Sequence, residues 1–284
     1  MLVICESGST KADWVLLDKN NKTYTETIGI NPLFHDINKI NSILQSNADL
    51  VKHNSLVKKI FFYGTSCSSA ERISRVKTAL QAFFTNAQLI EVRHDLDGAA
   101  YSVARADETS IVNIIGTGSN SCLFDGTKII DQIGGNGFIL SDEASGAYFG
   151  KRICGDYLIK MIPADMRQYI EQDMAVTRDI IMNNVYREPN ANVYLASFSK
   201  LLSHFASNEY VQNLINSGFD EFYKKHICRF DHYSKYPVHF IGSIAFYFKD
   251  NLASVSSKNN AQLGNIIQKP IEGLIQYHQS ELEA

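Results

Sequence analysis

The chain has 284 residues, 45% of them apolar, and a formal net charge of −3 at pH 7. This length is enough for one large or two medium-sized domains with hydrophobic cores of their own. A slightly acidic chain without a basic stripe is a poor match for nucleic acid, and no apolar run approaches the length that spans a membrane. The sequence begins directly with a strand-like run, which leaves no room for a signal peptide, so we expect a cytoplasmic protein.

Cysteine and histidine spacing argues against a disulfide framework and against a zinc site. The five cysteines are Cys5, Cys67, Cys122, Cys154 and Cys228. They are scattered, odd in number and include no C-x-x-C pair, which is typical of buried thiols in a reducing compartment. The eight histidines likewise show no metal-ligand spacing.

The first third of the chain alternates between strand and helix patterns. The apolar runs predict strands at 2–5, 12–17, 23–28, 58–63 and 89–92. Helical spacing predicts helices at 36–51, from a cap at Ser68 or Ser69 to about 83, and at 96–104.

The rest of the chain repeats this alternation. It predicts strands at 111–115, 121–124, 237–241 and 263–267, and helices from Ser141 through Ile153, over most of 165–226, through Phe248 and after Pro270. Two rounds of strands joined by crossover helices predict an α/β protein with two related halves. We expect an N-terminal domain at 1–110 and a C-terminal domain with a helical insertion at 111–267. A helix at 268–284 is expected to pack on the first domain.

Two glycine–hydroxyl turns, each between two strand-like runs, are the most informative feature of the chain. They read Glu6-Ser7-Gly8-Ser9-Thr10-Lys11 and Gly116-Thr117-Gly118-Ser119-Asn120. Such a turn presents backbone N–H groups and hydroxyls to one point, which suits phosphate oxygens. The chain has no G-x-x-x-x-G-K-[ST] or G-x-G-x-x-G motif, so neither a P-loop nor a dinucleotide Rossmann site is expected. Two copies of the turn indicate a duplicated module that binds a nucleotide.

Two acidic positions are candidates for chemistry on a bound ligand. Asp95 follows a predicted strand and begins a predicted helix, where open α/β sheets place their ligands, although a plain helix N-cap would look the same. Asp97 is close by but would point elsewhere from the first helical turn. Asp142 and Glu143 are expected to open another helix after the glycine-rich loop 134–137, which lets the backbone approach a small polar ligand such as a sugar.

Taken in order, these motifs resemble the N-acetylglucosamine kinases, which belong with the BadF/BadG/BcrA/BcrD-type ATPases in the superfamily of acetate and sugar kinases, heat-shock ATPases and actin. The matching motifs are Gly8-Ser9-Thr10-Lys11, Gly116-Thr117-Gly118-Ser119-Asn120, Gly134-Gly135-Asn136-Gly137, Ser141-Asp142-Glu143-Ala144-Ser145-Gly146 and Gly242-Ser243. The resemblance covers nearly the whole chain. It implies two ribonuclease-H-like (actin-like ATPase) domains with an interdomain ATP cleft, and ATP and Mg²⁺ as cofactors. The implied reaction is the phosphorylation of an amino sugar, foremost N-acetylglucosamine to its 6-phosphate, and relatives are often homodimers.

The resemblance also implies roles for single residues. Asp95 matches the catalytic base that accepts the proton of the sugar 6-hydroxyl, and Glu6 would hold Mg²⁺ through water, where the family usually carries Asp. The positions that match the ATP site are Gly8, Ser9, Thr10, Lys11, Thr117, Gly242 and Ser243. The positions that match the sugar site are Asn31, Ser119, Asn120, Gly135, Asn136 and Asp142. Asn136 stands where the animal kinases have tryptophan, so the contact with the N-acetyl group is expected to differ.

Two other functions share the implied fold. An ATP-driven activator of 2-hydroxyacyl-CoA dehydratases would hold an iron–sulfur cluster across a dimer, but the cysteines here do not follow its pattern. A non-catalytic sensor of sugar or nucleotide is favoured only by the altered first turn, and no appended DNA-binding segment is visible. An ATP-dependent sugar kinase is therefore the leading hypothesis.

Overall fold

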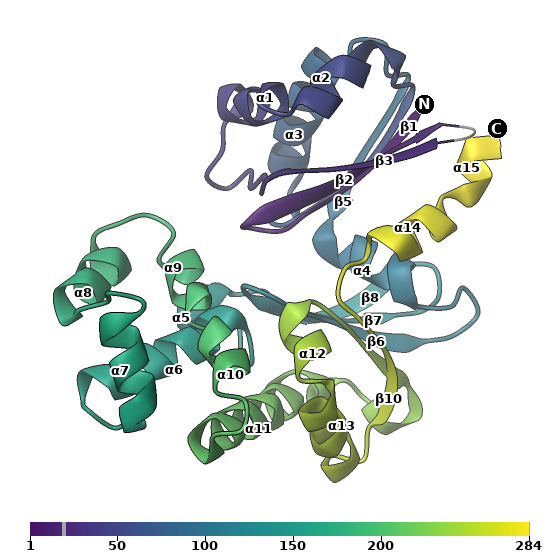
Figure 1. Cartoon of the computed structure of the whole chain (residues 1–284). Coiled ribbons are helices and arrows are strands. Elements are labelled where there is room, and N and C mark those ends of the chain that lie inside the picture. The colour runs from purple at the N-terminus through teal and green to yellow at the C-terminus, as the bar shows by residue number, and fades with distance from the viewer. Residues whose placement is uncertain (19–20, 284) are drawn as a thin grey trace. The chain divides into compact units, whose positions relative to one another are not determined.

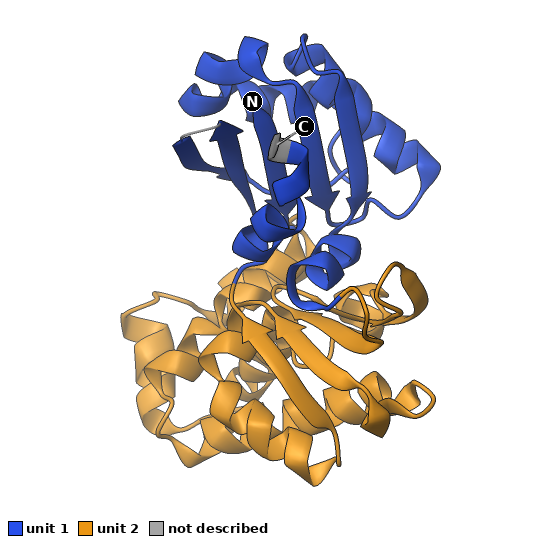
Figure 2. Ribbon diagram, turned by 90° about the vertical axis from the view of Figure 1, so that its right-hand side faces the viewer, with its two compact units in different colours: residues 1–105, 269–284 blue, residues 106–268 orange. Residues whose placement is uncertain are grey.

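A computed structural model of the chain describes residues 1–18 and 21–283. They form an α/β protein with two five-stranded sheets, which confirms the predicted fold class (Figure 1). The chain divides into two compact units (Figure 2). Unit 1 consists of Met1–Arg105 and Lys269–Ala284, and unit 2 of Ala106–Gln268.

Both sheets have the same strand topology. The first sheet contains β1 (Leu2–Ser7), β2 (Lys11–Asp18), β3 (Asn21–Ile28), β4 (Lys59–Gly64) and β5 (Leu89–His94), in the order β3-β2-β1-β4-β5. The second contains β6 (Ser110–Ile115), β7 (Ser119–Phe124), β8 (Ile129–Gly134), β9 (Pro237–Ile241) and β10 (Gln262–Ile267), in the order β8-β7-β6-β9-β10. In each sheet an antiparallel meander of three strands continues into two parallel strands. This repeat is the duplication that the two turns predict.

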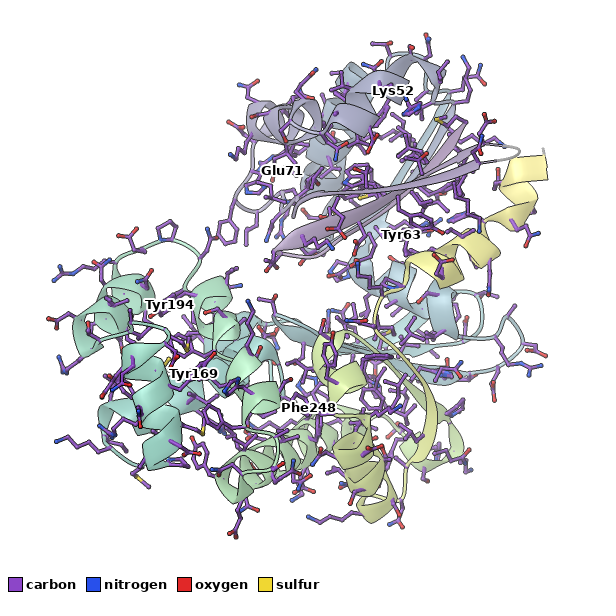
Figure 3. All side chains as sticks on the ribbon, viewed as in Figure 1. Lys52, Tyr63, Glu71, Tyr169, Tyr194 and Phe248 are labelled. Carbon is purple, nitrogen blue, oxygen red and sulfur yellow. The ribbon has the colours of Figure 1, made fainter. Side chains whose placement is uncertain are left out.

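Helices cover both faces of the sheet in unit 1. They are α1 (Ile37–Gln45), α2 (Ala48–His53), α3 (Ala70–Phe83), α4 (Asp95–Val103), α14 (Ile271–Tyr277) and α15 (Gln279–Glu283), with a 3₁₀ turn at Asn54–Leu56. One face packs on α1 and α3 and the other on α14, which is why the central strand β1 is apolar at successive positions. Tyr63, labelled in Figure 3, belongs to the second of these cores, together with Leu274 of α14. In place of the one helix expected at 268–284 the structure has α14 and α15, and α14 packs on the first sheet.

The helices of unit 2 pack into one large core with the second sheet. They are α5 (Gly137–Leu140), α6 (Gly146–Leu158), α7 (Ala164–Gln172), α8 (Arg178–Tyr186), α9 (Ala191–Ser197), α10 (Lys200–His204), α11 (Glu209–Lys225), α12 (Ser243–Tyr247) and α13 (Lys249–Lys258), with 3₁₀ turns at Ile227–Arg229 and Tyr233–Lys235. In this core Ile111 and Phe240 of the sheet join Phe149, Phe219 and Phe248 of the helices.

Several predicted boundaries are wrong. The helix expected to open at Ser141 begins at Gly146, because Asp142 and Ala144 have left-handed backbone angles (φ +66° and +59°) and Ser145 caps the helix. The strand expected at 121–124 begins at Ser119. The helix expected at 36–51 is divided into α1 and α2, since Asn47 starts a new cap.

Two expectations that concern the whole chain can be compared with the described residues. None of the described helices is both long enough and apolar enough to cross a membrane. The five cysteines carry free thiols, and all except Cys228 are buried, as the spacing predicts.

Candidate active site

The first glycine–hydroxyl turn is a three-residue connection between β1 and β2. The Gly8 N–H donates to the Lys11 carbonyl (2.9 Å) and closes the turn, and the Gly29 N–H donates to the Thr10 carbonyl (3.0 Å). A Cβ at Gly29 would lie 2.2 Å from the Gly8 carbonyl oxygen. Only glycine therefore lets the segment after β3 lie directly against the turn.

The Ser7 hydroxyl is bonded to the backbone of Ile30, unlike a hydroxyl that is presented to a ligand at the turn. It is fully buried, donates to the Ile30 carbonyl (3.2 Å) and accepts from the Ile30 N–H (2.8 Å). This bond places Asn31 next to the turn, where its Oδ1 accepts from the Leu33 N–H (3.0 Å). Thr10 is exposed, so its hydroxyl is better placed than that of Ser7 to meet a ligand.

Lys11 is engaged by carboxylates. Its ammonium group pairs with Asp13 (3.2 Å) and with Glu26, and Asp13 also pairs with Lys269 (3.0 Å). Lys11 is thus the first residue of β2, directly after the turn, and its side chain is on the same face of the strand as that of Asp13. Its role at phosphates stays a prediction.

A group of carboxyl side chains lies beside this turn. Glu6 is opposite Asp13 in the register of β1 and β2, and Asp95 follows β5. Burial and the charges of Asp95 and Asp13 raise the pKa of Glu6 to about 8, although Lys269 and Lys11 act in the opposite direction. The residue expected to hold Mg²⁺ and the expected base are therefore close enough to influence each other.

The donors of this group suit a magnesium ion held largely through water. Across residues 1–18 and 21–283, no three His, Cys, Asp or Glu side chains are placed to hold a metal ion together. Mg²⁺ prefers oxygen ligands, keeps several waters and is usually bound through one or two carboxylates plus substrate phosphates. Glu6 and Asp95 provide such oxygens, and the pKa of Glu6 is raised first by burial and then by the neighbouring charges of Asp95 and Asp13, which a cation would compensate.

Asp95 is the first residue of α4, and the helix is capped by His94. The His94 Nδ1 lies 3.3 Å from the Leu96 N–H and 2.9 Å from Asp95 Oδ1. Burial lowers the pKa of His94, but the Asp95 carboxylate outweighs this effect and the pKa is raised. The alternative explanation of Asp95 as the helix N-cap is therefore wrong, and its carboxylate is paired with a histidine instead.

The second turn, 116–118, is tied to the start of α6. The Gly116 N–H donates to the Gly118 carbonyl (2.9 Å). The carbonyls of Gly116 and Thr117 accept from the N–H groups of Gly146 (2.8 Å) and Ala147 (3.0 Å). The carbonyl groups of this turn thus accept from N–H groups at the N-terminus of α6, which have no hydrogen-bond partner within the helix.

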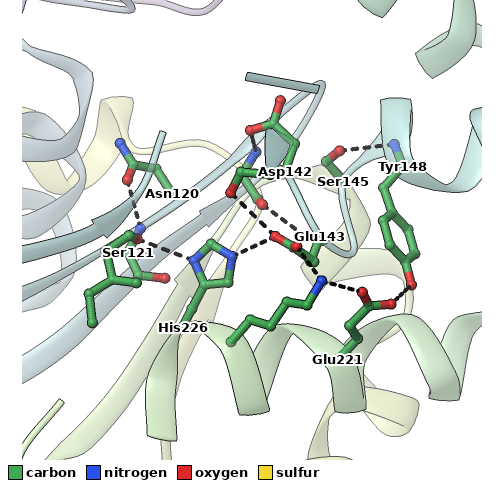
Figure 4. Close-up of polar contacts among 12 residues, drawn as sticks. Asn120, Ser121, Asp142, Glu143, Ser145, Tyr148, Glu221 and His226 are labelled. Carbon is green, nitrogen blue, oxygen red and sulfur yellow. Dashed lines mark hydrogen bonds and ion pairs between the residues drawn. The ribbon is translucent and has the colours of Figure 1, made fainter. Parts of the chain in front are cut away.

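Asp142 lies directly against this turn. Its Oδ1 accepts from the Ser119 N–H (3.2 Å), and the Ser119 hydroxyl donates to the Glu143 carbonyl (2.8 Å; Figure 4). A Cβ at Gly118 would lie 2.8 Å from Asp142 Oδ2. Burial raises the pKa of Asp142, against the effect of the bond from Ser119.

The Gly134-Gly135 bend lies against Asn120. Asn120 Oδ1 accepts from the Ser121 N–H (3.0 Å), and a Cβ at Gly135 would lie 2.9 Å from Asn120 Nδ2. The structure therefore brings together Ser119, Asn120, Gly135 and Asp142. Asn136 follows at the exposed start of α5, and Asn31 belongs to unit 1.

Gly242 lies at the same end of the second sheet. Its φ is +119°, and a Cβ would lie 2.3 Å from the Ile115 carbonyl oxygen and 3.3 Å from the Gly116 nitrogen. Gly242 and the adjacent Ser243, which begins α12, are thus next to the second turn and Thr117. Three of the residues expected to bind ATP therefore lie close together in unit 2, namely Thr117, Gly242 and Ser243.

Sequence reasoning missed a buried ion pair behind this region. His226 Nε2 lies 2.9 Å from Glu143 Oε2, and Lys225 Nζ lies 2.9 Å from Glu143 Oε1. Burial raises the pKa of Glu143, but the bonds from His226 and Lys225 outweigh this effect and lower it to about 2. The partners are 83 positions apart and share no motif, so the sequence held no signal for the pair.

Comparison with known proteins identifies the family. No family model matches the chain, and no curated protein matches it. Among solved structures, one described as a "Putative N-acetylglucosamine Kinase" from Porphyromonas gingivalis is 36% identical to this chain, with a TM-score of 0.92 and 99% of both chains covered. The chain belongs to the N-acetylglucosamine kinase family.

More distant structures share the fold of this family. A structure from Chromobacterium violaceum, described in the same words, is 16% identical, with a TM-score of 0.72 and 97% of this chain and 98% of that chain covered. A non-polymerising mutant of MamK bound to AMPPNP is 12% identical, with a TM-score of 0.58 and 100% and 98% covered. At these identities the two structures bear on the architecture, and they agree with the predicted actin-like fold.

Proposed function

We propose that this protein transfers the γ-phosphoryl group of ATP to the 6-hydroxyl of N-acetylglucosamine. The observation that carries the proposal is the 36% identity, over 99% of both chains, to the Porphyromonas gingivalis structure described as an N-acetylglucosamine kinase. The carboxylates beside the first turn and the polar groups beside the second supply the functional groups that phosphoryl transfer to a sugar requires.

Asp95 is proposed as the general base. Its carboxylate takes the proton of the sugar 6-hydroxyl while that oxygen forms a bond to the γ-phosphorus, and the bond to the β,γ-bridging oxygen breaks to release ADP. The placement of Asp95 at the first position of α4 supports this role because its buried Oδ1, 2.9 Å from His94 Nδ1, makes no hydrogen bond with the described residues and keeps its capacity to accept a proton.

ATP binding is assigned to the two turns and to the start of α12. The proposed residues are Gly8, Ser9, Thr10, Lys11, Thr117, Gly242 and Ser243. Mg²⁺, held through water with Glu6, would neutralise charge on the phosphates. The close approach of Gly242 to the second turn supports the inclusion of both segments.

Sugar binding is assigned to Asn31, Ser119, Asn120, Gly135, Asn136 and Asp142. Carboxylate and amide groups can accept from and donate to sugar hydroxyls and the N-acetyl group. The assignment is supported by the convergence in unit 2 of Ser119, Asn120, Gly135 and Asp142.

A coupled assay of ADP release tests the proposal across glucosamine, N-acetylglucosamine, N-acetylmuramic acid, N-acetylmannosamine and glucose. We expect the highest kcat/KM with N-acetylglucosamine and no ADP release above background without sugar. If no sugar raises ADP release while calorimetry shows tight sugar binding, the protein is a sensor, and the kinase proposal is wrong.

A further inference from the structure

The proposed sugar residues of unit 2 belong to three segments, and two of these are the paired ends of the β7–β8 hairpin, where Asn120 lies opposite Gly134. They lie at the start of β7, at the end of β8 and in the loop 141–145 before α6. None of these segments is held in place by a regular helix at the site itself, and Asp142 has a left-handed backbone. The Ser119 N–H joins the loop 141–145 to this hairpin through its bond to Asp142 Oδ1 (3.2 Å), and further contacts lie behind the loop.

His226 provides contacts to two of the three segments. It caps the C-terminus of α11, is 2% exposed and stacks on Phe222 with ring centroids 4.4 Å apart and an interplanar angle of 16°. Its Nε2 lies 2.9 Å from Glu143 Oε2 in the loop, and its Nδ1 lies 3.2 Å from the Ile133 carbonyl oxygen at the end of β8 (Figure 4). Both nitrogens face an oxygen, so both bonds are donated only when each nitrogen carries a proton.

Glu143 extends this connection to the third segment. Its carboxylate accepts from Lys225 of α11 (2.9 Å) and its backbone carbonyl accepts from the Ser119 hydroxyl at the start of β7 (2.8 Å). Lys225 is held in turn by Glu221 (2.7 Å), which pairs with Arg152 of α6 (2.9 Å). The Glu143 side chain thus joins the loop to α11 directly and to α6 through Lys225 and Glu221. The main chain of Glu143 joins the loop to the sheet.

The glycine bend fits closely over this pair. A Cβ at Gly134 would lie 2.6 Å from His226 Cε1, and Gly135 beside it touches Asn120. The position of the imidazole ring therefore determines where the Gly134-Gly135 backbone lies. Because Asp142 is adjacent to Glu143, the same ion pair also determines where the Asp142 carboxylate lies.

We propose that His226 and Glu143 are positioning residues that hold the sugar-binding segments of unit 2 in register and so set the affinity for the sugar without touching it. The inference rests on the proposed function. Helix α11 contributes none of the proposed sugar residues. The inference gives the end of this helix, at Lys225 and His226, a specific effect on sugar binding.

The test compares steady-state kinetics of the wild-type full chain with those of H226Q and E143Q. Gln at 226 carries its N–H donors on one nitrogen, in place of two ring nitrogens that face separate oxygens, and Gln at 143 keeps the shape but loses the charge. We expect the KM for N-acetylglucosamine to rise on the order of 10- to 100-fold in both variants, because small displacements of binding groups are costly. The KM for ATP should be unchanged and kcat should change far less than the sugar KM.

The matched control is H278Q. His278 is also buried (5% exposed), stacks on Phe61 (3.8 Å) and is hydrogen-bonded to Tyr63 (2.7 Å), but it belongs to unit 1. This variant should lose thermal stability without a change in sugar KM. If H226Q does not fold, E143Q alone decides the question, since it removes no atoms from the core.

The outcomes separate the two proposals. An active wild-type protein whose sugar KM is unchanged in E143Q, or rises equally in H278Q, overturns the positioning role and leaves the kinase function intact. A wild-type protein that releases no ADP with any sugar overturns the proposed function. Calorimetry then decides the positioning role, which is overturned if E143Q binds N-acetylglucosamine as tightly as the wild-type protein does, or if neither binds it.

Discussion

Glu6 in unit 1 and Glu143 in unit 2 both lie beside a glycine–hydroxyl turn, yet their surroundings shift their pKa values in opposite directions. Burial and the neighbouring Asp95 and Asp13 raise the pKa of Glu6 to about 8. Glu143 is also buried, but bonds from His226 and Lys225 lower its pKa to about 2. The Glu6 carboxyl group is desolvated beside two other carboxylates, whereas the Glu143 carboxylate is hydrogen-bonded to two donors.

This difference indicates what each turn region contributes. Carboxylates held close together without enough cations are suited to bind a metal ion or to take a proton, and they are costly to keep for structure alone. A carboxylate whose charge is fully compensated is suited to hold segments in place. The first turn region therefore carries the proposed chemistry, and the second carries the proposed architecture of sugar binding.

The largest expected effect separates Asp95 from its neighbour. D95N should lower kcat by a factor on the order of 10²–10⁴, the usual contribution of a general base. Binding of ATP, measured by calorimetry, should persist. D97N is the matched control, because Asp97 lies two positions further along the first turn of α4. A similar loss of kcat in D95N and D97N would contradict the assignment of Asp95 as the general base.

Alanine at glycines of the two turn regions should have unequal effects on stability. In G29A the new Cβ meets the Gly8 backbone oxygen at 2.2 Å, so we expect a loss of about 3 kcal/mol in the free energy of unfolding. In G118A the Cβ meets the end of the Asp142 side chain at 2.8 Å, which can rotate. The smaller loss of stability should come with a higher sugar KM.

Urea unfolding measures the loss of stability in G29A and in G118A, and G155A serves as the control. Gly155 lies within α6, and a Cβ there meets nothing within 4 Å. This variant should be as stable as the wild-type protein or slightly more stable, since alanine favours helix. An equal loss of stability in G29A and G118A would contradict the proposed difference between the turns.

The opposite pKa shifts predict opposite pH dependence of the free energy of unfolding. The folded pKa of Glu6 is raised from 4.5, so its contribution to stability is present below pH 4.5 and lost as the pH rises to about 8. The folded pKa of Glu143 is lowered, so its contribution is present above pH 4.5 and lost as the pH falls to about 2.

Unfolding free energies of E6Q and E143Q across this pH range measure both contributions. E6Q should match the wild-type protein near pH 4.5 and become the more stable of the two near pH 8. E143Q should be less stable than the wild-type protein at pH 7, and the difference should shrink towards pH 2. If both variants follow the wild-type protein in parallel, the two glutamates do not differ as described.

Local patterns in the sequence predict nine of the ten strands in the described residues, and they miss β8 (Ile129–Gly134). The apolar runs around both turns, and the alternation of strand and helix, are sufficient to predict the antiparallel hairpins and the α/β class, because each pattern is read from adjacent residues. The start of α6 shows where local patterns fail. Ser141, Asp142 and Ser145 could each cap a helix, and the carbonyls of Gly116 and Thr117, distant in sequence, select the start at Gly146.

In the candidate site, too, local patterns identify residues but do not show their distant contacts. Motifs identify positions such as Asp95 and Asp142. The partner of Asp142, the Ser119 N–H, is contributed by another segment, whereas His94 is adjacent to Asp95 in the sequence. Ser7 looks like a phosphate-binding hydroxyl in the sequence and is bonded to Ile30 in the structure. The His226–Glu143 pair depends on the packing of α11 against the loop, which no spacing of residues reveals.

The most direct test of the account is the identity of the product formed from ATP and N-acetylglucosamine. We expect phosphorus–proton correlation in NMR spectra to show a new phosphate ester on the C6 carbon of the sugar, formed in equal amount to ADP. Inorganic phosphate without a sugar ester, or an ester at another carbon, would contradict the account.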